Sequence, residues 1–500
     1  MDTTYAVDKS WMRTKPKSTG IGPETNPCLL VGGRYGTADM IPKFGPNATF
    51  QYILNSQAMA IKVLSENYPI IVPPEHAKIL VDTANLDHIS PQRIREIEAD
   101  THHDVVSINN AWEEVVNEIY PAASSHINKG RTSADSTETA KALQLKESTE
   151  IIINSLENLK DIILEKAMSW KDIPYMDLSH RYDALPTTAG RPLVHYAEML
   201  QSDIDKLYQT YQTSLFGKWG DATGNHHALT SIDVDNPEEI EKMYCEALGL
   251  LCMDAPAQTP GREYLFDFIE ALGRASGTMA NIATYIATGR GDDTNTFINV
   301  APGKKVGSST MPHKTVKNGN PSKEEQTMSY DNMLGGFIDT AHRSIRMAYA
   351  RDLSNSASDR IMHEIAFKWG DEVIRNLAKT VYYTNLNVDR SIERVERSFG
   401  VVTSSPLMTQ LTDHRKIEEP LSRKEAHDLT AELAKIAWDQ KRPFIDVLGE
   451  NKEIIERLDN EKLRKITNPL TYMGQSKEII QTVYDKYHGQ HKFADTQQTI

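Results

Sequence analysis

The chain has 500 residues, of which 39% are hydrophobic and 25% are charged, and its formal net charge is -14 at pH 7. This composition is typical of a soluble globular protein of several domains and excludes a disordered chain, a collagen-like repeat and a disulfide scaffold. The acidic balance argues against non-specific nucleic-acid binding, which needs a positively charged surface.

The cysteines and the N-terminal segment indicate a cytoplasmic protein. Cys28, Cys245 and Cys252 form neither a disulfide framework nor a CxxC metal motif. The segment from Met1 to Pro16 lacks the apolar core of a secretory signal. No apolar run approaches the ~18 residues that span a bilayer. We therefore expect no membrane association, and no residue pattern predicts a metal or an organic cofactor.

Apolar residues follow helical spacings from Phe50 onward, whereas residues 1–48 are rich in Pro, Gly and Thr and predict an irregular lead-in. Steps of three and four residues place one apolar stripe along a helix, most clearly over 145–163, 197–211 and 265–286. Helices of about 25–30 residues with such stripes pack side by side. The sequence therefore predicts an all-α fold built on a long-helix bundle.

Segments rich in Gly, Pro and polar residues interrupt this helical pattern at 129–136, 177–191, 217–225, 255–262 and 288–321. The last segment is longer than an ordinary bundle connection, which is typical of a functional loop. We predict three domains: an N-terminal helical domain over 1–114, a central long-helix bundle over 115–361 and a C-terminal helical domain over 362–500.

The sequence GSSTMPHK at residues 307–314 is the most informative part of the last segment. Glycine lets the backbone approach a ligand closely, and two hydroxyls beside an ammonium group can surround an anion. By composition alone, a plain connector is an equally good interpretation. The string followed by Asn320-Pro321 and Glu325 resembles the signature loop of the fumarase/aspartase superfamily, whose members are homotetrameric lyases that release fumarate by β-elimination.

Other segments resemble elements of this superfamily in the same order. They are TSAD at 132–135, SH at 179–180, PTTAG at 186–190 and GN at 224–225. A further set is similar to the adenylosuccinate lyase family within the superfamily: GRY at 33–35, THHDV at 101–105, QT at 258–259, RDLSNS at 351–356 with Arg360, and TYMG at 471–474. The resemblance implies a three-domain fold whose central bundle forms a tetramer core, with active sites shared between subunits.

The resemblance also implies catalytic roles. Ser308 would be the general base, and backbone N–H groups together with Lys314 would stabilise its alkoxide. His180 would be the general acid, with Glu325 holding its imidazole charged and oriented. Without the resemblance, Ser308 is more simply a loop hydrogen-bonder and His180 a surface or helix-capping residue.

The remaining implied residues would bind substrate. They are Arg34, Tyr35, His103, Asp104, Thr132, Ser133, Asn225, Gln258, Lys314, Asn320, Arg351, Ser356 and Arg360. Arginine suits a phosphate because its guanidinium donates hydrogen bonds in pairs. The alternative interpretation of the segment from Arg351 to Arg360 is a solvated helix start with salt bridges.

The motifs depart from the family pattern at three places. The segment SHRY at 179–182 lacks the glutamine of the superfamily's THxQ element. An insertion separates Lys314 from the Asn-Pro pair, so either Asn318 or Asn320 could be the ligand. Asn355 stands where the family has an aspartate.

The resemblance therefore implies release of fumarate from adenylosuccinate to give AMP, and the analogous carboxamide ribotide step of purine synthesis. A sister lyase acting on another N-substituted succinate is one alternative, but it has no use for Arg34, Ser356 and Arg360 together. A helical scaffold without catalysis is the other, and the presence of Ser308 with His180 weighs against it.

Overall fold

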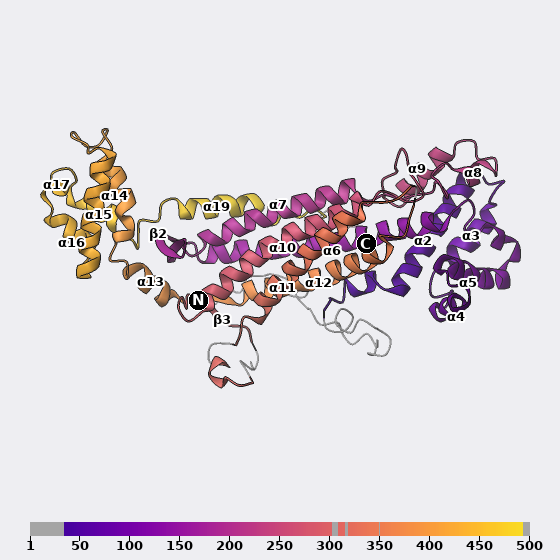
Figure 1. Cartoon of the computed structure of the whole chain (residues 1–500), viewed down its shortest axis with the longest axis horizontal. Helices are drawn as coiled ribbons and strands as arrows, with labels where there is room; N and C mark the ends of the chain where they lie inside the picture. Colours follow the sequence, from indigo (N-terminus) through magenta and orange to yellow (C-terminus); the bar gives the residue numbers. More distant parts are fainter. Residues whose placement is uncertain (1–34, 303–308, 316–318, 350, 494–500) are drawn as a thin grey trace.

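Long helices packed side by side form the centre of the computed structural model, which describes residues 35–302, 309–315, 319–349 and 351–493. These helices are α6 (Ser133–Ser169), α7 (Arg191–Thr213), α10 (Glu263–Arg290), α11 (Ser322–Ser344) and α12 (Ser356–Tyr382). Figure 1 shows them running along the long axis of an elongated molecule. Within the described residues, no helix is long and apolar enough to cross a membrane.

The apolar stripes read from the sequence face the interior of this bundle. The predicted stretches 145–163, 197–211 and 265–286 lie inside α6, α7 and α10, so the prediction of an all-α long-helix fold is confirmed. Leu156 of α6 and Ile204 of α7 are both fully buried. Burying such a side chain contributes about 1.5–3 kcal/mol each, which is why the stripes determine the packing.

A glycine lets α11 and α12 approach closely. Gly370 of α12 lies against Tyr330 of α11, and a Cβ at residue 370 would lie 2.5 Å from the tyrosine hydroxyl oxygen. The same hydroxyl donates to the carbonyl oxygen of Ala366 at 2.8 Å. A larger residue at 370 would therefore push the two helices apart.

Shorter helices form a unit at one end of the bundle, on the right of Figure 1. They are η2 (Ile41–Lys43), α2 (Pro46–Asn67), α3 (Pro74–Thr83), α4 (Pro91–Thr101), α5 (Asp104–Ile119) and η3 (Pro121–His126). The connection between α7 and α10 also reaches this end, and it contains α8 (His227–Thr230) and α9 (Pro237–Ala247). The hydroxyls of Ser56 in α2 and Tyr244 in α9 lie 2.7 Å apart and join the two parts.

A second helical unit lies at the opposite end of the bundle (Figure 1). It contains α13 (Val388–Glu396), η5 (Val401–Thr403), α14 (Ser404–Leu411), α15 (Arg423–Gln440), α16 (Phe444–Glu450), α17 (Lys452–Ile455) and α18 (Asn460–Thr467). Its buried residues, such as Leu407 and Phe444, form a hydrophobic core separate from that of the bundle. Helix α19 (Ser476–Tyr487) then returns along α7, and its Ile480 is fully buried in the bundle core.

Two short antiparallel strand pairs and one short 3-10 helix complete the described fold. Strands β1 (Pro174–Ser179) and β2 (Tyr182–Thr188) form a hairpin, β3 (Phe297–Asn299) pairs with β4 (Thr384–Leu386), and the 3-10 helix is η4 (Pro312–Thr315). The sequence predicted only a polar break where the hairpin lies. Ser179 pairs with Tyr182, so His180 and Arg181 form the hairpin turn, with φ angles of 53° and 69°.

The predicted domain boundaries fall inside helices. Residue 114 lies within α5, and residue 361 lies within α12, whose Asp371 accepts a hydrogen bond from Ser155 of α6. Since α12 is part of the bundle, we propose to place the boundaries before α6 and after β4 instead.

A buried carboxylate ties three parts of the chain together. Asp371 is fully buried and accepts hydrogen bonds from Thr37, from Ser155 at 2.6 Å and from the Nε of Arg375 at 3.0 Å. The neighbouring Glu372 accepts from the backbone N–H of Gly36 at 2.8 Å. This network holds the segment that precedes η2 against α12 and α6.

We expect the substitution Asp371→Ala to destabilise the fold strongly. It removes the buried carboxylate that Thr37, Ser155 and Arg375 share and leaves Arg375 paired with the exposed Asp39, so we expect a loss of about 3 kcal/mol. The matched control is Asp339→Ala, which removes an exposed partner of Arg343 and should change stability little. Urea unfolding of the two variants measures the difference, and equal losses would contradict the role assigned to the network.

Candidate functional site

A polar cavity of about 440 Å³ lies where α5, α6 and α12 begin. It brings together six residues predicted to bind substrate: His103, Asp104, Thr132, Ser133, Arg351 and Arg360. Adjoining it is a cavity of about 380 Å³, which is lined by Ser356 and again by Asp104, Arg351 and Arg360. The motifs around residues 103, 133 and 356 are distant in sequence, and the fold places them around one hollow.

The start of α5 orients the His103 imidazole. His103 is the N-cap of α5, where its Nδ1 accepts a hydrogen bond from the backbone N–H of Val106 at 3.4 Å. Its Nε2 lies 3.4 Å from the hydroxyl of Ser133. A neutral imidazole that accepts at Nδ1 carries its proton at Nε2, so His103 can donate toward Ser133 and the cavity.

A capping box fixes the start of α6. The backbone N–H of Thr132 donates to the carboxylate of Asp135 at 2.8 Å, and the Thr132 side chain accepts in return from the third residue of the helix. Asp135 is fully buried and pairs with the ammonium of Lys218. The aspartate of the TSAD segment therefore holds Thr132 and Ser133 at the edge of the cavity. The backbone N–H groups in the first turn of α6 that have no partner within the helix favour an anion there.

Two arginines line this cavity beside the carboxylates of Glu98 and Asp104. The side chain of Arg360 is 70% exposed, and its guanidinium lies 3.8 Å from the carboxylate of Asp104. Arg351 is also exposed at the rim of both cavities. An exposed ion pair at this distance is weak, so Arg360 is available to a phosphate or carboxylate.

A buried ion network that the sequence did not predict supports the arginines. Glu138 of α6 accepts two hydrogen bonds from Arg262, at 2.7 and 3.0 Å, and lies 3.7 Å from Lys141. The Nε of Arg262 lies 3.3 Å from Asp359 of α12. Burial alone would raise the pKa of Glu138, but Lys141, Arg262 and Arg351 outweigh it and lower the pKa to about 2.

His180 lies far from this cavity within the chain. It is exposed at the tip of the β1–β2 hairpin and makes no hydrogen bond with the described residues. Figure 1 places β2 and α5 at opposite ends of the bundle. One chain therefore does not bring the predicted general acid to the predicted substrate-binding residues.

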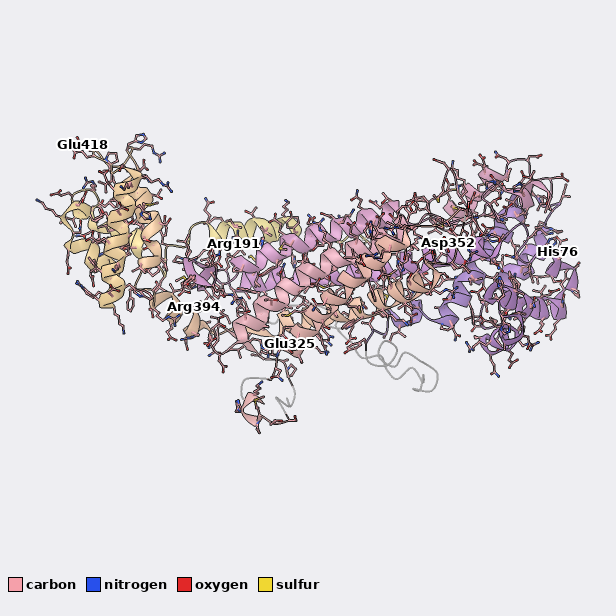
Figure 2. All side chains as sticks on the ribbon, in the orientation of Figure 1. His76, Arg191, Glu325, Asp352, Arg394 and Glu418 are labelled. Atoms are coloured by element: carbon pink, nitrogen blue, oxygen red, sulfur yellow. The ribbon has the colours of Figure 1, made fainter. Side chains whose placement is uncertain are left out.

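The residues around the signature loop lie away from this cavity, toward the hairpin end of the bundle (Figures 1 and 2). Glu325 is exposed in the first turn of α11, Asn320 is exposed just before that helix, and Lys314 is half-buried in η4. Figure 2 shows Glu325 well separated along the molecule from Asp352, which lines the smaller cavity. Ser308, Asn318 and Arg34 lie outside the described residues.

The remaining predicted residues occupy other positions. The ring of Tyr35 packs on Trp369, with centroids 4.9 Å apart, and so contacts the middle of α12 rather than its start. The exposed side chain of Asn225 donates to the Thr223 hydroxyl at 3.0 Å. Gly224 has a φ of +76°, and a Cβ there would lie 1.9 Å from the carbonyl oxygen of Pro256. The turn carrying Asn225 therefore packs closely on the segment that carries the half-buried Gln258.

Comparison with known proteins identifies the class of this chain. Residues 37–330 match the protein family described as Lyase, which is more than half of the chain, and the chain therefore belongs to that family. Residues 400–483 match the family described as Adenylosuccinate lyase C-terminus. The resemblance identified from the motifs, to the adenylosuccinate lyases of the fumarase/aspartase superfamily, is thereby confirmed.

Named relatives agree with this assignment, and solved structures share the fold. The chain is 27% identical over 452 residues to the adenylosuccinate lyase of Pyrococcus horikoshii, a match that covers 90% of this chain and 96% of the relative. It is 27% identical over 433 residues to that of Bacillus subtilis, covering 86% and 94%. The fold matches a fumarate lyase from Mesorhizobium with a TM-score of 0.77 at 17% identity, covering 92% of this chain and 99% of that one.

A structure from another branch shows how widely the fold is shared. The 3-carboxy-cis,cis-muconate lactonizing enzyme from Pseudomonas putida matches with a TM-score of 0.78 at 20% identity, covering 92% of this chain and 99% of that one. Identity this low supports the fold and leaves the chemistry to the site residues.

We expect the contribution of Glu138 to stability to depend on pH. Its pKa falls from an ordinary value of 4.5 to about 2 in the folded chain, so the ionised group stabilises the fold above about pH 4.5, and this contribution is lost as the pH decreases toward 2. Unfolding of wild type and Glu138→Gln across this range measures it. The difference between the two should be constant near neutral pH and shrink in acid, and a difference that is independent of pH would contradict the pairing.

Proposed function

We propose that this chain is an adenylosuccinate lyase that cleaves adenylosuccinate to AMP and fumarate in the cytoplasm, and that it also performs the analogous carboxamide ribotide step. The observation that carries this proposal is the cavity at the starts of α5, α6 and α12, which combines His103, Ser133 and two arginines. The family match and the named relatives support the same reaction.

The cavity suits a substrate with several negative charges. Arg351 and Arg360 can each donate paired hydrogen bonds to phosphate or carboxylate oxygens. Helix starts add backbone N–H donors and a favourable dipole at the same place. Glu98 and Asp104 also line the cavity, so binding of an anion there depends on the hydrogen bonds that the arginines and helix starts donate.

The elimination requires two proton transfers. In this proposal Ser308 removes a proton from the carbon beside the one that bears nitrogen, and the electrons of that C–H bond form the C=C bond of fumarate. The electron pair of the broken C–N bond leaves on the nitrogen, which takes a proton from His180. Glu325 would hold the imidazole charged. Lys314 and Asn320 would bind the carboxylate on which negative charge increases.

The distances along the bundle favour a site shared between copies. His180 and the substrate cavity lie at opposite ends of the same helices, so one chain cannot place both on one substrate (Figure 1). Association of bundles side by side would bring the hairpin of one copy to the cavity of another. We therefore propose a homotetramer with shared sites.

Mixing inactive variants tests the shared site. His103→Ala and His180→Ala should each lose most of the activity, and tetramers reassembled from a mixture of both should recover part of it, because some sites then combine two intact ends. The control mixture, His103→Ala with Ser133→Ala, should recover none, because both changes lie in the same cavity. Ultraviolet assay with adenylosuccinate measures the recovery, and no recovery in the first mixture would contradict a shared site.

The substitution Arg360→Ala should raise the KM for adenylosuccinate about 10–100-fold with a smaller change in kcat, because it removes a charge-assisted hydrogen bond worth about 1.5–3 kcal/mol. Arg343→Ala, which changes an exposed arginine on α11, is the matched control. An unchanged KM would place the phosphate elsewhere. The same assay with aspartate, argininosuccinate and malate tests the alternative of a sister lyase. Turnover of one of these compounds instead of adenylosuccinate would favour that alternative.

A further inference from the structure

A larger cavity, of about 920 Å³, lies at the other end of the molecule, where the β1–β2 hairpin, α7 and the C-terminal unit meet. Figure 2 labels Arg191, which stands at this junction at the start of α7. Two of the family-like segments meet there, since Thr187 of PTTAG and Tyr472 of TYMG both line the cavity. The proposed elimination uses neither segment.

Contacts across the junction hold the cavity in shape. The hydroxyls of Thr187 and Ser476 lie 2.9 Å apart and join the hairpin to the start of α19. Arg394 of α13 donates to Asp183 of β2 at 2.8 and 3.0 Å. These contacts anchor the hairpin to α19 and to α13, and such anchoring is typical of a preformed binding pocket of this size.

The cavity can bind an anion. The side chain of Arg191 lines it and makes no hydrogen bond or ion pair with the described residues. Helices α7, α14 and α19 all begin at the cavity, where Arg191, Ser405 and Ser476 lie on its wall. A guanidinium beside helix starts favours phosphate or carboxylate oxygens.

The cavity can also bind an aromatic ring. Tyr175, Tyr196, Tyr285 and Tyr472 line it, and the rings of Tyr196 and Tyr285 have centroids 5.5 Å apart. The Tyr285 hydroxyl is buried beside Tyr175. Among the described residues it has no hydrogen-bond partner at ordinary distance and angle. Burial raises the pKa of Tyr285, so it keeps a proton to donate. The carboxylate of Asp177 on the same wall can accept from an amino group.

We propose that this junction cavity binds a nucleoside monophosphate. Arg191 and the three helix starts contact the phosphate, the tyrosines stack on the base, and Asp177 accepts from its amino group. A free anion would leave the aromatic wall unused, and a neutral aromatic ring would leave Arg191 unpaired. Because β1 and β2 carry His180 at their turn, an occupant would also restrain the hairpin. A catalytic effect of this restraint rests on the proposed function, whereas binding in the junction cavity does not.

Calorimetric titration of the purified protein with AMP tests the proposal. We expect two AMP molecules per chain, one of which is lost in Arg360→Ala and the other in Arg191→Met. Tyr472→Ala should weaken the second site about tenfold or more through loss of stacking. The matched control is Arg397→Met, an exposed arginine outside the cavity, which should retain both sites.

The outcomes separate this proposal from the proposed active site. One AMP per chain that is lost in Arg191→Met supports the junction cavity and counts against the first cavity. AMP binding that is unchanged in both Arg191→Met and Tyr472→Ala overturns the junction site. In titrations, adenosine and inorganic phosphate should each bind much more weakly than AMP. If inorganic phosphate binds as tightly as AMP, the proposed junction site is also overturned.

Discussion

The length of a single rigid helix determines how this protein can work. Helix α6 has 37 residues, and at 1.5 Å per residue it extends about 55 Å. The starts of α5, α6 and α12 lie at one end of the bundle, and the hairpin with His180 lies at the other (Figure 1). Groups so far apart cannot act on one small substrate, so the chemistry that we propose requires a second copy of the bundle.

Buried charges connect the stability of the bundle to its proposed function. Asp135 holds the capping box of α6, Glu138 pairs with Arg262 beneath the cavity, and Asp371 ties α12 to the segment before η2. Each carboxylate has several donors, which offsets the cost of removing it from water. The contacts of Asp135 hold the start of α6 with Ser133, and the pairing of Arg262 with Asp359 holds the start of α12 with Arg360, so the charges that stabilise the bundle also order the site.

The sequence predicted the long helices well because apolar steps of three and four residues are a local signal. It missed the β1–β2 hairpin, since the segment is short and polar. It therefore did not predict that His180 lies in a hairpin turn. Glu138, Arg262 and Asp359 also escaped prediction, because their pairing joins residues that are far apart in the chain. Tyr35 shares a motif with Arg34, but its observed ring contact is with Trp369 in the middle of α12.

The sequence by itself determined the all-α class, the stretches that form the bundle and the family to which the chain belongs, because helical periodicity and short motifs are contained in neighbouring residues. Only the tertiary structure decided which motifs share a cavity. It joined His103, Ser133 and Arg360, separated them from His180, and brought PTTAG and TYMG together around a second cavity. The physical reason is that long-range packing of rigid helices, rather than local pattern, sets the distance between two side chains.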